Sequence, residues 1–168
     1  SHPDDYVQKI RNLGFGADLK LEIDGYEKAR VRKRSDNPDR WYNTTLGWMS
    51  YGYETQVPPI YTLAFFNAIA NGGRYMRPYF VSEIRSRNEV IKTFEPTVVR
   101  ERICKPTTLT AIQEMLRRVV TEGTGKKARS PFVAISGKSG TAQLSSGRGG
   151  YRDSTGHIRH QVSFCAYF

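Results

Sequence analysis

The chain has 168 residues, of which 38% are hydrophobic and 25% charged, and its formal net charge is +10. This composition fits one globular domain with a sizeable core and excludes a disordered or fibrous protein. No apolar run approaches the roughly 20 residues needed to cross a bilayer, and no basic-then-apolar leader opens the chain, so we expect nothing in it to insert into or target a membrane.

The positive charge favours an anionic partner such as nucleic acid, an acidic membrane surface or an anionic polymer. It is densest over residues 28–34 (KARVRKR), and a second cluster comprises Arg148, Arg152, Arg159 and His160. Neither cluster has the aromatic and glycine pattern of an RNA-recognition strand, and no helix-turn-helix or zinc-finger spacing is present. We therefore expect a solvated basic surface and no nucleic-acid partner.

The first 73 residues predict two helices separated by an irregular region. Pro3 and the acids after it open a helix that Gly14 stops, and residues 17–56 are rich in charge and turn formers. A second helix begins at Pro58-Pro59 and runs to the break at Asn71-Gly72-Gly73. Its apolar residues, with Phe65, Phe66 and Ile69 among them, fit a core face better than a ligand pocket.

A hairpin and a third helix follow. Two β-like runs, 79–85 and 89–94, are joined by Ser86-Arg87-Asn88. The third helix starts at Pro106 and ends before Gly123, and we expect its apolar stripe to pack on a sheet. The stripe comprises Leu109, Ile112, Met115, Leu116, Val119 and Val120.

The last third contains Ser136-Gly137-Lys138-Ser139-Gly140-Thr141-Ala142-Gln143, a predicted strand after the apolar run 132–135. Two glycines in four residues weaken a strand interior and indicate a place where something approaches the backbone closely. A phosphate-binding P-loop is excluded, because Phe132 and Val120 stand where it requires glycine. A strand edge with a merely solvated lysine remains the plain alternative. A glycine-rich loop over 145–160, containing Gly147, Gly149, Gly150 and Gly156, and a strand over 162–168 complete the chain, and we expect the loop to be mobile.

Cysteine and histidine offer little further chemistry. Cys104 and Cys165 are too few for a disulfide framework, and their apolar neighbours predict two buried free thiols. His157, His160 and Cys165 supply only three candidate metal ligands, and the spacing is not a standard zinc pattern. We therefore expect no metal and no cofactor.

Four segments in order resemble the transpeptidase domain of class B penicillin-binding proteins, most closely the cell-division members. They are residues 12–16 (NLGFG), 50–73 (SYGYE to ANGG), 116–128 (LRRVVTEGTGKKA) and 136–143 (SGKSGTAQ). The resemblance implies an α+β fold with helices packed on a mainly antiparallel sheet. It also implies a peptidoglycan D,D-transpeptidase that cross-links stem peptides through an acyl-serine intermediate and binds penicillin.

The chain departs from the family pattern at the nucleophile. No serine is followed three places later by lysine, and Ser35-Asp36-Asn37 satisfies Ser-x-Asn only in a turn that comes after the 12–16 segment rather than before it. We therefore expect residues 1–168 to be a single partial domain that lacks the nucleophile half and the last strand and helix, and that is inactive alone. Its exposed strand edge predicts self-association.

The resemblance also implies roles for the lysine strand. The Thr141 amide supplies half of an oxyanion hole, and Lys138 supplies positive charge. The hydroxyls of Ser139 and Thr141 bind the terminal carboxylate of a D-Ala-D-Ala stem peptide or of a β-lactam, and Gly140 and Gln143 complete the substrate-binding strand. Gly137 is expected to serve packing against a helix.

The resemblance implies a parent protein anchored in the inner membrane, with this domain on the periplasmic or extracellular side and divisome partners. The alternative from another class is a non-catalytic basic module that binds a protein or an anionic polymer.

Overall fold

The structure is a computed structural model that describes residues 2–147 and 150–168. Arg148 of the second basic cluster and Gly149 of the glycine-rich loop lie outside the described residues. The chain forms two compact units, Ser1–Lys105 and Pro106–Phe168, and each is described by itself. Within the described residues, no helix has both the length and the apolar character needed to cross a bilayer.

The first unit begins with helix α1 (Pro3–Ile10), where proline and two acids occupy the first turn and the amide of Asp4 lies 3.4 Å from Nδ1 of His2. A π-helical turn, Arg11–Phe15, follows, and Gly14 leaves helical geometry with φ +113°, at the predicted stop. The irregular region contains a 3-10 turn (Pro38–Arg40) and a short helix, α2 (Thr45–Met49), that the sequence did not predict.

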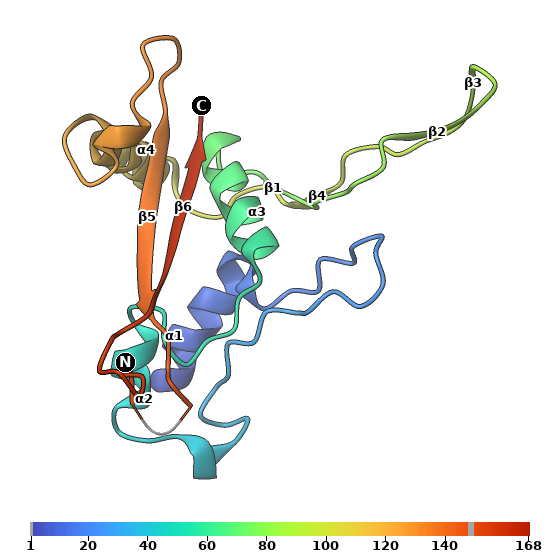
Figure 1. Cartoon of the computed structure of the whole chain (residues 1–168). Coiled ribbons are helices and arrows are strands. Elements are labelled where there is room, and N and C mark those ends of the chain that lie inside the picture. Colours follow the sequence, from blue (N-terminus) through green and yellow to red (C-terminus); the bar gives the residue numbers. More distant parts are fainter. Residues whose placement is uncertain (1, 148–149) are drawn as a thin grey trace. The chain divides into compact units, whose positions relative to one another are not determined.

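Helix α3 (Pro59–Ala70) has the predicted start and stop. It packs against the short strand β1 (Tyr75–Met76), which pairs with β4 (Val98–Arg100). The predicted hairpin is present as β2 (Glu83–Ser86) and β3 (Glu89–Thr93), and it extends away from α3 in Figure 1.

Two buried clusters form the core of the first unit. The larger one consists of Leu19, Tyr61, Ala64, Ala68 and Tyr75, and the smaller one of Val7, Val31 and Met49. Ile69 is also buried, and Phe65 packs against the larger cluster, with its ring centroid 5.3 Å from that of Phe15. The interpretation as core is confirmed for Phe65 and Ile69, whereas Phe66 is half-buried and is not among the residues packed against either cluster.

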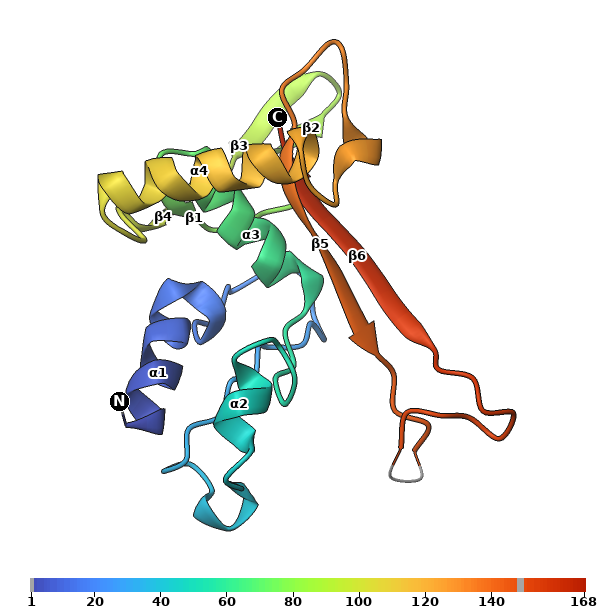
Figure 2. The same cartoon turned by 90° about the vertical axis from the view of Figure 1, so that its left-hand side faces the viewer.

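The second unit consists of helix α4 (Pro106–Thr121), a 3-10 turn (Lys126–Ala128), and strands β5 (Ser136–Gln143) and β6 (His160–Tyr167). The C-terminal end of α4 lies beside the first half of β5, as predicted (Figures 1 and 2). The expected burial of the whole α4 stripe is wrong, because Val120 is buried but Met115 is 60% exposed. A two-stranded sheet is too narrow to cover a helix of four turns.

Candidate functional site

Strand β5, which contains the lysine and both hydroxyl residues, is paired along its whole length with β6. The antiparallel register runs from Ser136 opposite Tyr167 to Gln143 opposite His160 without a bulge. One residue further on, the amide of Leu144 donates to the carbonyl of Arg159 at 2.9 Å, which continues the ladder. The strand is therefore regular, and its two edges can be assigned residue by residue.

The hydrogen bond of Leu144 fixes which backbone groups face away from β6. In an antiparallel pair, alternate residues direct both N–H and C=O to the partner, and the residues between them direct both groups to the opposite edge. Even-numbered residues therefore bond to β6, and the odd-numbered Ser139 and Thr141 face the other edge. No strand of the described residues pairs with that edge. We call it the open edge of β5, and the amide of Thr141 is directed toward it.

The side chains of β5 alternate between two faces. Ser139, Thr141 and Gln143 share one face, and Lys138 and Gly140 start from the other. Lys138 is exposed, and its Nζ donates to the carbonyl oxygen of Ser139 at 2.7 Å. Because that carbonyl belongs to an odd-numbered residue, the ammonium reaches the open edge. The structure thus brings the two hydroxyls together on one face and places the positive charge at the adjoining edge.

Two contacts from the α4 region hold the site, and neither was predicted. Oγ1 of Thr124, in the segment after α4, lies 3.1 Å from Oγ of Ser139. Nη1 of Arg117 donates to the carbonyl oxygen of Ile135 at 2.9 Å, directly before β5 begins. Both residues belong to the 116–128 segment, whose hydroxyl and guanidinium groups were the available signal. These contacts fix the position of β5 relative to α4.

The close packing of β6 leaves little room for a side chain at Gly137 and Gly140 of β5. A Cβ atom on Gly140 would lie 2.6 Å from Oγ of Ser163. On Gly137 it would lie 2.7 Å from Cβ of Ala166 and 2.7 Å from the carbonyl oxygen of Cys165. The expectation that Gly137 serves packing against a helix is therefore wrong, since the three nearest atoms all belong to β6. The close approach at these glycines is that of the neighbouring strand.

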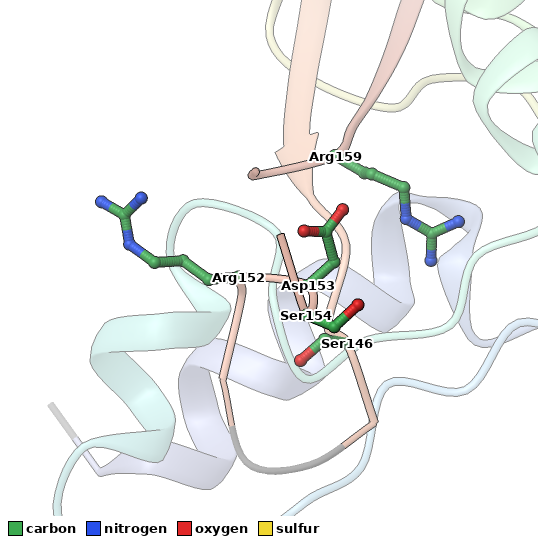
Figure 3. A pocket seen from close by; sticks show the side chains of 5 residues that line it. All are labelled: Ser146, Arg152, Asp153, Ser154 and Arg159. Atoms are coloured by element: carbon green, nitrogen blue, oxygen red, sulfur yellow. The ribbon is translucent and has the colours of Figure 1, made fainter. Parts of the chain in front are cut away.

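The loop between β5 and β6 contains a cavity of about 660 Å³. Figure 3 shows Arg152 and Arg159 extending in opposite directions with Asp153 between them. The hydroxyl of Thr155 and the amides of His157 and Thr155 donate to Asp153 and lower the pKa of its carboxyl group. The acid therefore holds the turn at residues 153–157, and the two guanidinium groups do not converge on one point (Figure 3).

The surroundings of the cysteines and histidines can be compared with the sequence. Both cysteines are free, as predicted, but each is only half-buried, so the prediction that the thiols are buried is wrong. Burial raises the pKa of the Cys165 thiol. Nδ1 of His157 lies 2.8 Å from the hydroxyl of Thr155, and within the described residues no three His, Cys, Asp or Glu side chains gather as a metal site.

The chain is similar to known proteins over almost its whole length. A family model described as the penicillin binding protein transpeptidase domain matches residues 2–168. A peptidoglycan D,D-transpeptidase FtsI homolog from Mesostigma viride is 29% identical, over 99% of this chain and 29% of that protein. The chain therefore spans less than a third of the length of that relative.

Two solved structures show the same fold. The transpeptidase domain of penicillin-binding protein 3 from Burkholderia pseudomallei is 27% identical, with a TM-score of 0.72 over 99% of this chain and 45% of that one. Penicillin-binding protein 3 of Mycobacterium tuberculosis, solved with ampicillin, is 24% identical, with a TM-score of 0.77 over 98% of this chain and 36% of that one. The α+β expectation is confirmed, and the relatives' names agree with the cell-division type. Because the family model matches residues 2–168, the chain belongs to the penicillin-binding protein transpeptidase family.

Proposed function

We propose that this chain is the substrate-binding part of a serine-type peptidoglycan D,D-transpeptidase, a single partial domain whose nucleophile lies elsewhere in a longer protein. Membership of the transpeptidase family supports the reaction class. The sequence has no Ser-x-x-Lys motif, which is the usual source of nucleophile and base in these enzymes, so the chain alone is inactive.

The observation that carries this proposal is the open edge of β5. A stem peptide ending in D-Ala-D-Ala lies along it as an added strand and is held by main-chain hydrogen bonds. The Thr141 amide, directed to this edge, supplies half of an oxyanion hole. One such donor stabilises a transition state by about 3 kcal/mol. The other half comes from the nucleophile's own amide.

The side chains of β5 supply the remaining contacts with the substrate. The hydroxyls of Ser139 and Thr141, on one face, bind the substrate's terminal carboxylate. Lys138 adds positive charge at the open edge, close to the carbonyl of Ser139. Gly140 keeps β5 close to β6, and Gln143 extends the binding face. A β-lactam occupies the same groove because its acylating group resembles the D-Ala-D-Ala carbonyl.

The alternative of a basic binding module is less well supported. Much of the charge in residues 28–34 is compensated, because Lys28 pairs with Asp18 at 2.7 Å and Arg30 with Glu27 at 2.9 Å. Arg32 pairs with Glu54. The densest run is therefore a set of surface ion pairs rather than a free basic patch.

For the parent protein we propose an anchor in the inner membrane, the domain outside it, and divisome partners.

Labelling with a fluorescent penicillin tests the proposal in the longer protein that contains this chain. The unchanged protein takes up label covalently, and Lys138→Ala abolishes the uptake. Lys127→Ala, which removes an exposed charge from the same unit but not from β5, is the matched control and retains labelling. An unlabelled parent, or equal labelling of the Lys138 and Lys127 variants, contradicts the proposed function.

A further inference from the structure

A second cavity lies in the first unit, between α3 and the segment after β1, and it is unrelated to β5. Its volume is about 410 Å³, within the range of ligand pockets. The walls are mainly apolar, and their polar groups are the side chains of Asn67 and Arg77 and the hydroxyl of Tyr79. The lining consists of Leu63, Ala64, Asn67, Met76, Arg77, Pro78, Tyr79 and Pro96.

Arg77 is the unusual member of this lining. Its Nε is buried and has no hydrogen-bond partner, and its guanidinium has no ion pair within the described residues. By contrast, Arg74, three residues earlier, pairs with Glu101 at 3.2 Å. Glu22 and Glu95 line a neighbouring cavity of about 210 Å³ that Arg77 also borders, but neither forms a salt bridge with it. A buried donor without an acceptor is costly, so a ligand that supplies a carboxylate gains this hydrogen bond.

The surroundings of the cavity fit a peptide better than a small molecule. Leu63 and Tyr79, which line the cavity, are 54% and 40% exposed, and Phe80, the next residue in the chain, is 56% exposed. An exposed apolar patch rimmed by polar groups marks an interaction site. Within the described residues, the amides of 79–81 donate no backbone hydrogen bond, so this segment also offers free main-chain donors to an extended partner.

We propose that this cavity binds a peptide segment of a partner protein in which an Asp or Glu stands next to a bulky apolar residue. The carboxylate accepts from Arg77, the apolar side chain enters the cavity against Leu63 and Met76, and the segment's backbone lies along residues 79–81. The net charge of +10 attracts acidic segments in general, and Arg77 selects the position of the acid. This inference does not depend on the transpeptidase assignment.

Titration of the whole chain with two blocked peptides tests the proposal by NMR. The probes are acetyl-Ala-Leu-Asp-Leu-Ala-amide and the same peptide with Asn in place of Asp. The Asp peptide shifts the Nε–H signal of Arg77 and the side-chain amide of Asn67, and it binds at least about tenfold more tightly than the Asn peptide. Free 4-methylpentanoate is a third probe, and preferential binding of this small carboxylate over both peptides overturns the peptide proposal.

Variants separate this site from general attraction to a basic protein. Arg77→Gln removes most of the preference for the Asp peptide and leaves only the general attraction of a basic chain, and Leu63→Ser weakens the binding of both peptides. Arg74→Gln removes the same charge outside the cavity and leaves the preference for Asp unchanged. Because the Asp-to-Asn comparison needs no change in the protein, a poorly folded Arg77→Gln variant leaves the test intact. Equal binding of the two peptides to the unchanged chain, or loss of the preference in Arg74→Gln, overturns the proposal.

Discussion

The two glycines of β5 give a stability prediction that can be worked from the geometry. In Gly137→Ala the new methyl group lies 2.7 Å from both Cβ of Ala166 and the carbonyl oxygen of Cys165. Neither atom can rotate away, because one is fixed to the backbone and the other is part of it. Overpacking of this kind costs about 1–3 kcal/mol, and alanine returns part of that by restricting the unfolded chain. We expect a net loss of about 2 kcal/mol.

The matched variant is Gly140→Ala in the same strand. Its methyl group lies 2.6 Å from Oγ of Ser163, which is the end of a small side chain and can change rotamer. We expect Gly140→Ala to change the stability by less than about 1 kcal/mol. Thermal unfolding followed by circular dichroism measures both, and the Gly137 variant should melt about 4–8 °C lower. Equal melting temperatures for the two variants would refute the argument from rigid and movable neighbours.

Three further predictions concern hydroxyls and edges. Tyr75→Phe removes a buried hydroxyl that has no hydrogen-bond partner, so it should raise the free energy of unfolding. Tyr61→Phe removes a 3.0 Å hydrogen bond to the carbonyl oxygen of Ala17, so it should lower the free energy of unfolding by about 1 kcal/mol. Chemical denaturation measures both changes. Burial raises the pKa of Tyr75 to about 12, so the unfolded chain ionises first and stability should fall between about pH 10 and pH 12. In Tyr75→Phe this alkaline loss should be smaller, and an unchanged pH profile would count against the burial argument. Val162, which is 74% exposed on β6, should promote self-association of the chain. Sedimentation should therefore show association that Val162→Lys reduces. A chain that stays monomeric at all concentrations contradicts this prediction.

The elements with strong local signals were predictable from the sequence. Proline at the start of α3 and of α4 fixes the first turn, and the hairpin turn is confirmed where Arg87 and Asn88 adopt positive φ. Helix α2 gives no such signal, since it is five residues long and contains a glycine. The pairing of Tyr75 with Arg100 depends on chain folding over 25 positions, which no local pattern encodes.

For the site, the strand itself was predictable, but which groups lie on which face and edge of the strand was only partly foreseen. Alternation of side chains along a strand already separates Lys138 from Ser139 and Thr141. The return of the Lys138 ammonium to the Ser139 carbonyl depends on rotamers of a flexible side chain. The contact between Thr124 and Ser139 depends on the packing of α4, and the sequence pattern does not specify it.

The open edge of β5 has a consequence for evolution under antibiotic pressure. A main-chain amide is present whichever side chain is attached to it, so almost every substitution at Thr141 preserves that donor. Proline alone among the common residues deletes it, and it also distorts the strand. Under the proposed function, substitutions that weaken β-lactam binding at this amide therefore act by reshaping its surroundings, because no mild substitution removes the donor itself.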